Sequence, residues 1–239
     1  MISMADLVED LIDHPKTILF LDTCEFLDVI RRFGEHDPRE ANNDNARSFG
    51  AILGALRAGS AQVQVVVSYL VRHEWDQNLS VARATVIAYL QDTGRRIDLI
   101  AEACLLGKIA APSLSERLDR LDLADRLVSL AENLLQQALV IGRDDECVER
   151  ALGRVMDRRR PSHKREIKDS IHWEHYLEVS RRLELAEYDL ERFFVSGNKA
   201  DFWANKNTPT IHPDLEPEAK TAGLRFFGRL DWALPELGL

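Results

Sequence analysis

The stretch "TILFLDT" at residues 17–23 decides the fold class, because four consecutive apolar residues, Ile18 to Leu21, end at the charged residue Asp22. A short apolar run without helical spacing is typical of a strand that is covered on both faces, as in parallel sheets. Ligands of open parallel sheets bind just beyond the carboxyl ends of the strands. Asp22 is therefore expected either at the mouth of a site or, since Asp is a favoured N-cap, at the start of a helix near Cys24.

Three later segments are also predicted to be strands: "VQVVVSYL" (63–70), "RFFVSGN" (192–198) and "GLRFFGRL" (223–230). Segments with helical spacing lie between them; one precedes Gly59 and another is expected to stop at Gly94. The segment "ALVIG" (138–142) fits either a short strand or the end of a helix. This alternation predicts an α/β fold in which helical layers cover both faces of a mainly parallel sheet.

The chain of 239 residues has no linker-like stretch or internal repeat, so we expect a single domain over residues 1–239. Residues of about 95–150 are almost wholly helical in pattern, and Ser113 with Glu116 fits a capping box. We expect this region to be a helical elaboration of the domain.

Composition limits the function classes. No signal-like or membrane-spanning stretch is present, which predicts a cytoplasmic protein without a membrane partner. Three widely separated cysteines suggest neither a disulfide framework nor a zinc motif. The net charge of -9 argues against binding nucleic acid with the whole surface, whereas the basic run "RVMDRRRPSHKREIKDS" (154–170) could do so locally.

Three more acids occupy positions like that of Asp22. Glu74 follows the second strand, Asp169 lies in the first turn of a predicted helix, and Asp201 follows "RFFVSGN". Each alone fits an ordinary helix-start or surface charge. Together they predict a cluster of oxygen ligands that suits Mg²⁺ or Mn²⁺.

Ordinary structural roles are expected for several residues next to these acids. Glu174 is predicted to be a solvated helix charge, and His172 and His175 to be core or surface histidines rather than ligands. Core packing is preferred to base stacking for the nearby aromatic residues Trp173, Phe202 and Trp203.

The sequence resembles the PIN domain ribonucleases, and more specifically their bacterial PIN-like branch with the signature FVSxNKxDF. Four motifs carry the resemblance: "ILFLDT" with Asp22, "VRHEW" with Glu74, "KDSIHWEHYL" with Asp169, and "FFVSGNKADF" with Asp201. It covers most of the chain except about residues 95–150. It implies a three-layer α/β/α fold and hydrolysis of RNA phosphodiester bonds by metal-activated water.

The resemblance also implies residue roles. The catalytic and metal-binding residues would be Asp22, Glu74, Asp169 and Asp201. The substrate-binding residues would be Thr23, Arg165, Lys168, Ser196, Asn198 and Lys199, with Thr23 and Ser196 holding a water or a phosphate.

RNA, single-stranded or structured, is the expected partner. The family resemblance admits a toxin held by an antitoxin protein, and a homodimer is a further expectation. Two other readings compete. An aspartyl-phosphate hydrolase or receiver-like domain fits less well, because "LDTCE" lacks the second Asp two positions on. A catalytically inactive PIN-like module that binds RNA or protein is the main alternative.

Overall fold

The computed structural model describes residues 1–34, 43–59, 62–108, 122–162, 166–205 and 207–239. Its centre is a five-stranded sheet in the order β3-β2-β1-β4-β7, in which all neighbouring strands are parallel. The strands are β1 (Thr17–Leu21), β2 (Val63–Ser68), β3 (Leu139–Ile141), β4 (Arg192–Val195) and β7 (Leu224–Phe227). The predicted strands at 17–21, 63–68, 192–195 and 224–227 are therefore confirmed, and "ALVIG" contributes a short edge strand.

Alternation along each strand divides the apolar residues between two cores. On β1, Leu19 and Leu21 face one core, while Ile18 and Phe20 face the other, and all four are fully buried. Both faces of the sheet therefore need a helical cover, which explains the unbroken apolar run of "TILFL".

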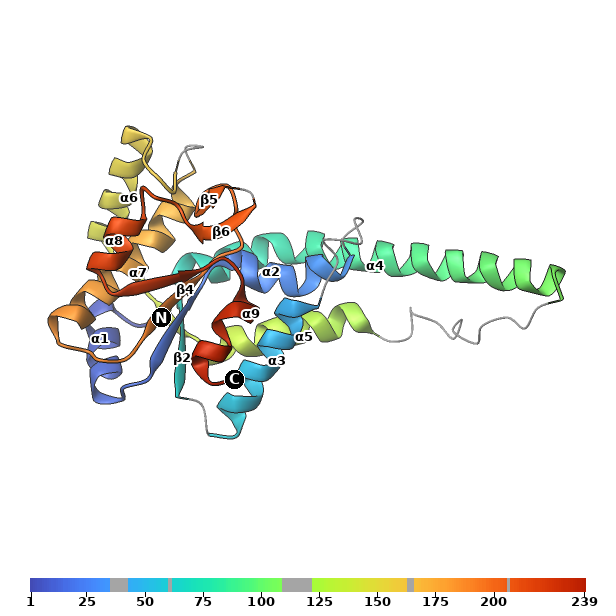
Figure 1. Ribbon diagram of the computed structural model, residues 1–239, viewed down its shortest axis with the longest axis horizontal. Helices are drawn as coiled ribbons and strands as arrows, with labels where there is room; N and C mark the ends of the chain where they lie inside the picture. Colours follow the sequence, from blue (N-terminus) through green and yellow to red (C-terminus); the bar gives the residue numbers. More distant parts are fainter. Residues whose placement is uncertain (35–42, 60–61, 109–121, 163–165, 206) are drawn as a thin grey trace.

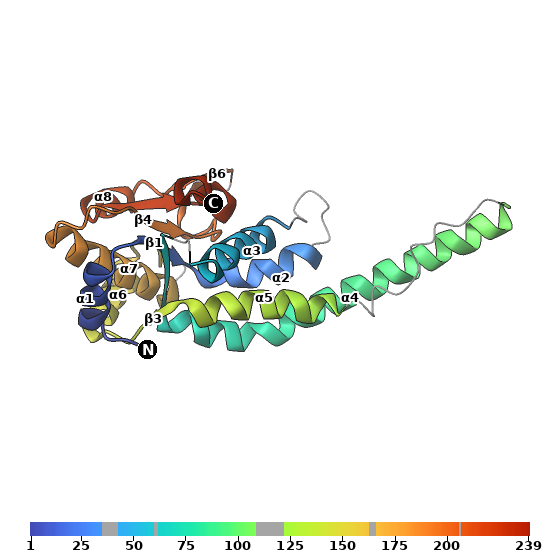
Figure 2. The ribbon, with the colours of Figure 1, turned by 90° about the horizontal axis from the view of Figure 1, so that it is seen from below.

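The first core lies under α2 (Thr23–Arg31), α3 (Asp44–Arg57), α4 (Tyr69–Leu106), α5 (Leu123–Gln137) and α9 (Leu230–Ala233). The second lies under α1 (Met4–Asp13), α6 (Asp145–Asp157), α7 (Ile167–Leu185) and α8 (Glu216–Thr221). The α1, α6, α7 and α8 group and the α2 to α5 group lie on opposite sides of the sheet in Figures 1 and 2. The fold is a three-layer α/β/α sandwich, as predicted.

Smaller elements complete the chain. An antiparallel hairpin joins β5 (Trp203–Asn205) to β6 (Thr208–Ile211), directly after the loop that follows β4. Two 3₁₀ turns, η1 (Arg32–Gly34) and η4 (Pro235–Leu237), extend α2 and the C-terminal helix.

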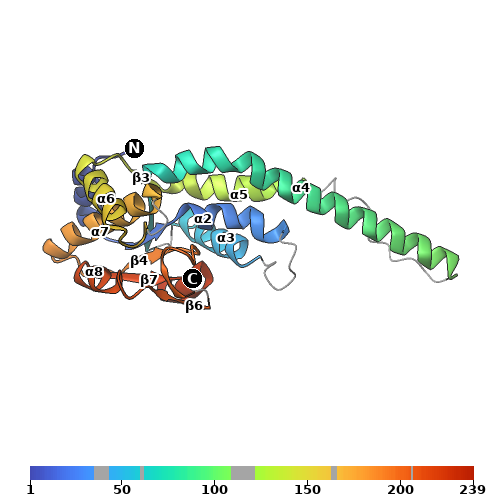
Figure 3. The ribbon, with the colours of Figure 1, turned by 90° about the horizontal axis from the view of Figure 1, so that it is seen from above.

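Helix α4 corrects the prediction that a helix stops at Gly94. It runs unbroken for 38 residues through that glycine, whose cost inside a helix is only about 1 kcal/mol. Its buried residues end at Leu90, and its outer part projects beyond the body of the protein in Figures 1, 2 and 3. None of the described helices, α4 included, combines the length and apolarity that crossing a bilayer requires.

The described residues of the region of about 95–150 are mostly helical, and they also contribute a strand to the central sheet. The region holds the outer part of α4, then α5 and the first turns of α6, and it inserts β3 as the edge strand beside β2. The predicted capping box at Ser113 and Glu116 lies outside the described residues.

Candidate active site at the carboxyl edge of the sheet

The carboxyl edge of the sheet brings three of the four predicted acids to one cavity. Asp22 directly follows β1, Glu74 lies in the second turn of α4 after β2, and Asp169 lies in the first turn of α7. All three line a cavity of about 820 Å³. Asp201 lies in the loop after β4, is almost fully buried, and acts on Asp169 through its charge.

Asp22 is both an N-cap and a member of this cluster. Its Oδ1 accepts a hydrogen bond from the backbone N–H of Thr23 at 2.7 Å, which caps α2. Its Oδ2 accepts from the hydroxyl of Ser196 at 2.6 Å, across the β1–β4 pair. The two sequence interpretations of Asp22 are therefore compatible.

Glu74 is held as an ionised carboxylate by three donors. Its Oε2 accepts from Thr23 Oγ1 at 2.6 Å and lies 3.2 Å from His172 Nε2, and its Oε1 lies 3.2 Å from Lys168 Nζ. Burial alone would raise the pKa of Glu74, but the hydrogen bonds from His172, Thr23 and Lys168 lower it to about 2. The same partnership raises the pKa of the fully buried His172, against the effect of its burial.

Asp169 has the opposite environment. Burial raises its pKa to about 8, and the negative charges of Asp22 and Asp201 add to that increase. Its Oδ1 accepts a long hydrogen bond of 3.3 Å from Asn198 Nδ2. The cluster therefore contains a stabilised carboxylate, Glu74, and a carboxyl group whose charge the surroundings oppose.

The loop that follows β4 carries the "SGNKAD" motif and is tied to the acids. The amide of Asn198 donates to Asp169, while its carbonyl oxygen Oδ1 accepts from the backbone N–H of Ala200 at 3.2 Å. The backbone N–H of Asn198 donates to Ser196 Oγ at 3.2 Å. Ser196 and Asn198 thus position two different acids, and Lys199 lines the cavity beside them.

Thr23 and Ser196 use their hydroxyl groups to hold Glu74 and Asp22 in the structure. A role in holding water or phosphate stays a prediction for both. Lys168 lines the cavity, yet its ammonium group is paired with Glu74. Arg165 lies outside the described residues.

Part of the basic run is engaged in contacts within the protein, and nucleic-acid binding by this run stays a prediction. Arg154 is buried and paired with Glu174 and Glu218, and Arg159 is paired with Glu218 at 3.0 Å. Arg160 donates to the backbone carbonyl of Ala200. These side chains join α6 to α7 and α8 within one helical layer and brace the loop that carries Asp201.

Glu174 was wrongly predicted to be a solvated charge. It is buried, and it is paired with Arg150 at 2.9 Å and Arg154 at 2.5 Å on the face of α7 that meets α6. The aromatic residues Trp173, Phe202 and Trp203 are core residues, as expected. His172 and His175 are also buried, and His172 directly contacts Glu74.

Two charged residues of α2 close to the acids, Arg31 and Glu25, were not singled out from the sequence. Arg31 lines the acidic cavity together with Thr23 and Leu27. These three residues follow one another at a spacing of four, which places them on the same face of α2, and this spacing could have indicated Arg31 as a residue of the site. Glu25 is buried behind the loop after β4, where its Oε1 accepts from the backbone N–H of Gly197 at 2.7 Å. Burial and the charge of Asp28 raise the pKa of Glu25 to about 8.

The acids supply oxygen donors of the type that hard divalent cations prefer. Within the described ranges, however, no three His, Cys, Asp or Glu side chains are already grouped in positions that could hold a metal ion. Asp22 and Glu74 instead direct oxygens at hydroxyl groups and at Lys168.

Comparison with known proteins gives one match. A family model described as a PIN domain matches residues 19–202, which contain all four acids and the motifs around them. The match is to this family model and does not address the bacterial branch. Neither a curated protein nor a solved structure matches the chain.

Proposed function

Because the chain belongs to the PIN domain family, whose members are generally metal-dependent nucleases, we propose that its acidic cavity hydrolyses RNA phosphodiester bonds with Mg²⁺ or Mn²⁺. One observation carries the proposal. Asp169 is a half-buried carboxyl group whose ionised form is opposed by its loss of solvent and by the charges of Asp22 and Asp201, which the charge of His172 offsets only in part. A divalent cation is the partner that such a cluster suits best.

The four acidic side chains have the chemistry that a divalent cation requires. Asp22, Glu74, Asp169 and Asp201 would hold the cation, and all four offer only carboxylate oxygens. When bound, a divalent cation lowers the pKa of a water and stabilises charge on the phosphate under attack. Neither a histidine nor a serine nucleophile is then needed.

The chain's own residues would position the reactants. The hydroxyl groups of Thr23 and Ser196 fix the directions of Glu74 and Asp22, and Asn198 fixes that of Asp169. Lys199 and Arg31, which line the same cavity, supply positive charge for the RNA backbone. Thr23, Ser196 and Asn198 are positioning residues in this account, because each holds an acid.

Cleavage of a mixed RNA pool tests the proposal. The protein is expected to cut RNA with Mn²⁺ and to lose this activity in EDTA. Asp169→Asn is expected to reduce the rate at least about 100-fold, as removing one electrostatic contributor does in other enzymes. Glu149→Gln, which changes an exposed acid of α6, is the matched control and should cut at the parental rate.

Equal cleavage by Asp169→Asn and the parent protein would remove the acidic cavity from the reaction. If the protein binds RNA but does not cut it, either with Mn²⁺ or in EDTA, the alternative of an inactive PIN-like module that binds RNA or protein would be favoured. The finer predictions of a toxin role, an antitoxin partner, a homodimer and a cytoplasmic location rest on the sequence alone. Growth arrest by the expressed parent, and none by Asp169→Asn, would support the toxin role.

A further inference from the structure

A second, smaller cavity of about 170 Å³ lies beside the acidic cavity. Helix α2 separates the two: Thr23, Leu27 and Arg31 face the acidic cavity, while Glu25, Asp28 and Arg32 face the second one. These two sets follow the i, i+3, i+4 rows of one helix. Gly197 and Lys199 line both cavities, so the loop after β4 is their common wall.

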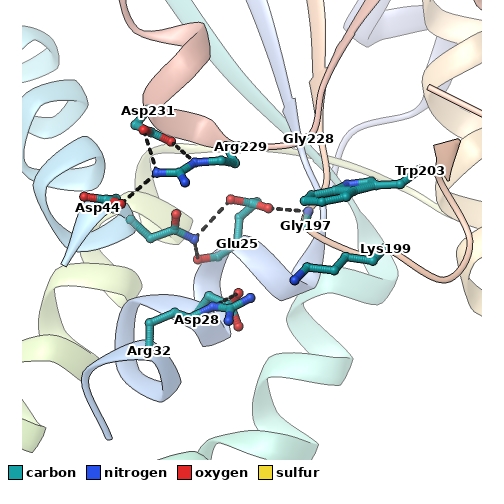
Figure 4. Close-up of a pocket in the computed structure, with 11 residues that line it drawn as sticks. Glu25, Asp28, Arg32, Asp44, Gly197, Lys199, Trp203, Gly228, Arg229 and Asp231 are labelled. Carbon is teal, nitrogen blue, oxygen red and sulfur yellow. Dashed lines mark hydrogen bonds and ion pairs between the residues drawn. The ribbon is translucent and has the colours of Figure 1, made fainter. Parts of the chain in front are cut away.

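The charges that line the second cavity nearly balance. Arg229 pairs with Asp44 and Asp231 at 2.8 Å, and Arg32 pairs with Asp28 at 3.0 Å. Figure 4 shows these two clusters on either side of Glu25. A phosphate needs an excess of positive charge and a divalent cation needs an excess of negative charge. The cavity suits neither, and its many donors and acceptors suit a neutral, polar ligand.

The size of the cavity favours a ligand with a single ring. A cavity of about 150 Å³ accepts one benzene molecule, whereas drug-sized ligands occupy roughly 300–1,000 Å³. One side is bordered by the indole of Trp203, which is fixed by a hydrogen bond of 2.9 Å from its Nε1 to the backbone carbonyl of Ser196. The ammonium group of Lys199 lies 5.5 Å from the centre of that ring (Figure 4).

Asn45 adds a polar edge that is held in place. Its Nδ2 donates to Glu25 Oε2 at 3.1 Å and to the backbone carbonyl of Glu25 at 3.2 Å. Single-stranded RNA bases are recognised by stacking on aromatic rings and by hydrogen bonds to their edges. The second cavity is lined by an indole ring and by the polar groups of Asn45 and Glu25, and the loop after β4 separates it from the proposed reaction site.

We propose that the second cavity binds one pyrimidine base of the RNA strand whose phosphate lies in the acidic cavity. This inference rests on the proposed function. It makes the protein selective for cytosine or uracil at one position flanking the cut. A purine, with its second fused ring, exceeds the cavity unless a wall residue is removed.

Sequencing of the ends produced from a randomised RNA pool with Mn²⁺ tests the inference. The parent protein is expected to enrich C or U about tenfold at one flanking position. Arg32→Ala removes a wall and is expected to admit purines there, which lowers the enrichment to about threefold or less without abolishing cleavage. A tenfold preference corresponds to about 1.4 kcal/mol. Arg57→Ala, at the exposed end of α3, is the matched control and should keep the preference.

A second measurement does not depend on catalysis or on a variant that folds. In NMR spectra of the parent protein, cytidine or uridine is expected to shift the Trp203 indole and the backbone amides of Gly197 and Gly228, while adenosine and guanosine leave them unchanged. Cleavage without a flanking preference, or with a purine preference, would overturn the inference and leave the proposed function intact. Absence of cleavage would overturn the proposed function, and the nucleoside spectra would then decide whether the cavity binds a base.

Discussion

Asp169 shows how burial and neighbouring charge act on one residue. Its pKa is raised to about 8, whereas that of Glu74, in the same cluster, is lowered to about 2. The two pKa values differ because the contacts differ. The carboxylate of Glu74 is contacted by the donor groups of Thr23, His172 and Lys168, whereas that of Asp169 accepts one hydrogen bond, from the amide of Asn198. Opposite pKa shifts of neighbouring acids are typical of functional sites.

The raised pKa of Asp169 predicts a pH dependence of stability. An unfolded Asp has a pKa of about 3.9, so between about pH 4 and pH 8 the folded protein binds a proton that the unfolded chain has released. The free energy of unfolding should therefore fall as the pH rises through this range, and Glu25 adds to the slope.

Asp169→Asn should remove the contribution of Asp169 to that slope, because an amide carries no charge and its oxygen can still accept from Asn198. In EDTA at pH 8 the variant is expected to be more stable than the parent by about 1–3 kcal/mol, with little difference at pH 4. Urea unfolding at both pH values measures this, with Glu149→Gln as the control. A variant that is less stable than the parent at pH 8 would show that Asp169 is a structural acid.

The central strands were predictable because helices cover both faces of the sheet. Side chains that point to either face are then apolar, so each strand appears in the sequence as an unbroken apolar run. The run "TILFL" and its partners at 63–68 and 192–195 carry that signal, and β1 indeed lies between β2 and β4. Strand β3 was ambiguous because three residues are too few to distinguish a strand from a helix end. Helix α4 passes Gly94 because one glycine costs less than its many helical hydrogen bonds contribute.

Gly228, in the turn after β7, has no room for a side chain unless neighbouring atoms move. A Cβ at Gly228 would lie 2.6 Å from Pro209 Cβ, 2.7 Å from its carbonyl oxygen and 2.9 Å from the Trp203 ring. Gly228→Ala is expected to lower the free energy of unfolding by about 1–3 kcal/mol through overpacking. Gly54→Ala is the matched control, because nothing lies within 4 Å of its Cβ position and α3 should gain up to about 1 kcal/mol. Thermal melts that rank the two variants in the reverse order would contradict this packing.

The candidate site was partly predictable because carboxyl ends of parallel strands share one edge of a sheet. That rule alone places Asp22, Glu74 and the loop of Asp201 close together. Long-range side-chain partners were not predictable. The sequence does not show that Arg154 of α6 pairs with Glu174 of α7, or that Lys168 of α7 pairs with Glu74 of α4.

The negative net charge of the protein would repel an approaching RNA strand. The net charge is -9, and part of the basic run is used in ion pairs between elements. Local cations such as Arg31 and Lys199 would therefore meet the backbone at the cavity itself. Neutralising the acidic cluster with a divalent cation would remove the repulsion that the RNA phosphates otherwise face there.

Thermal melting of the whole protein across a Mn²⁺ titration shows whether this cation binds in the acidic cavity. A cation that binds only the folded state stabilises it by mass action, by about 2.7 kcal/mol at 100 times its dissociation constant. Mn²⁺ is expected to raise the melting temperature of the parent and of Glu149→Gln, and to raise that of Asp169→Asn much less. No rise in the parent protein, or an equal rise in Asp169→Asn, would contradict a metal site built on this cluster.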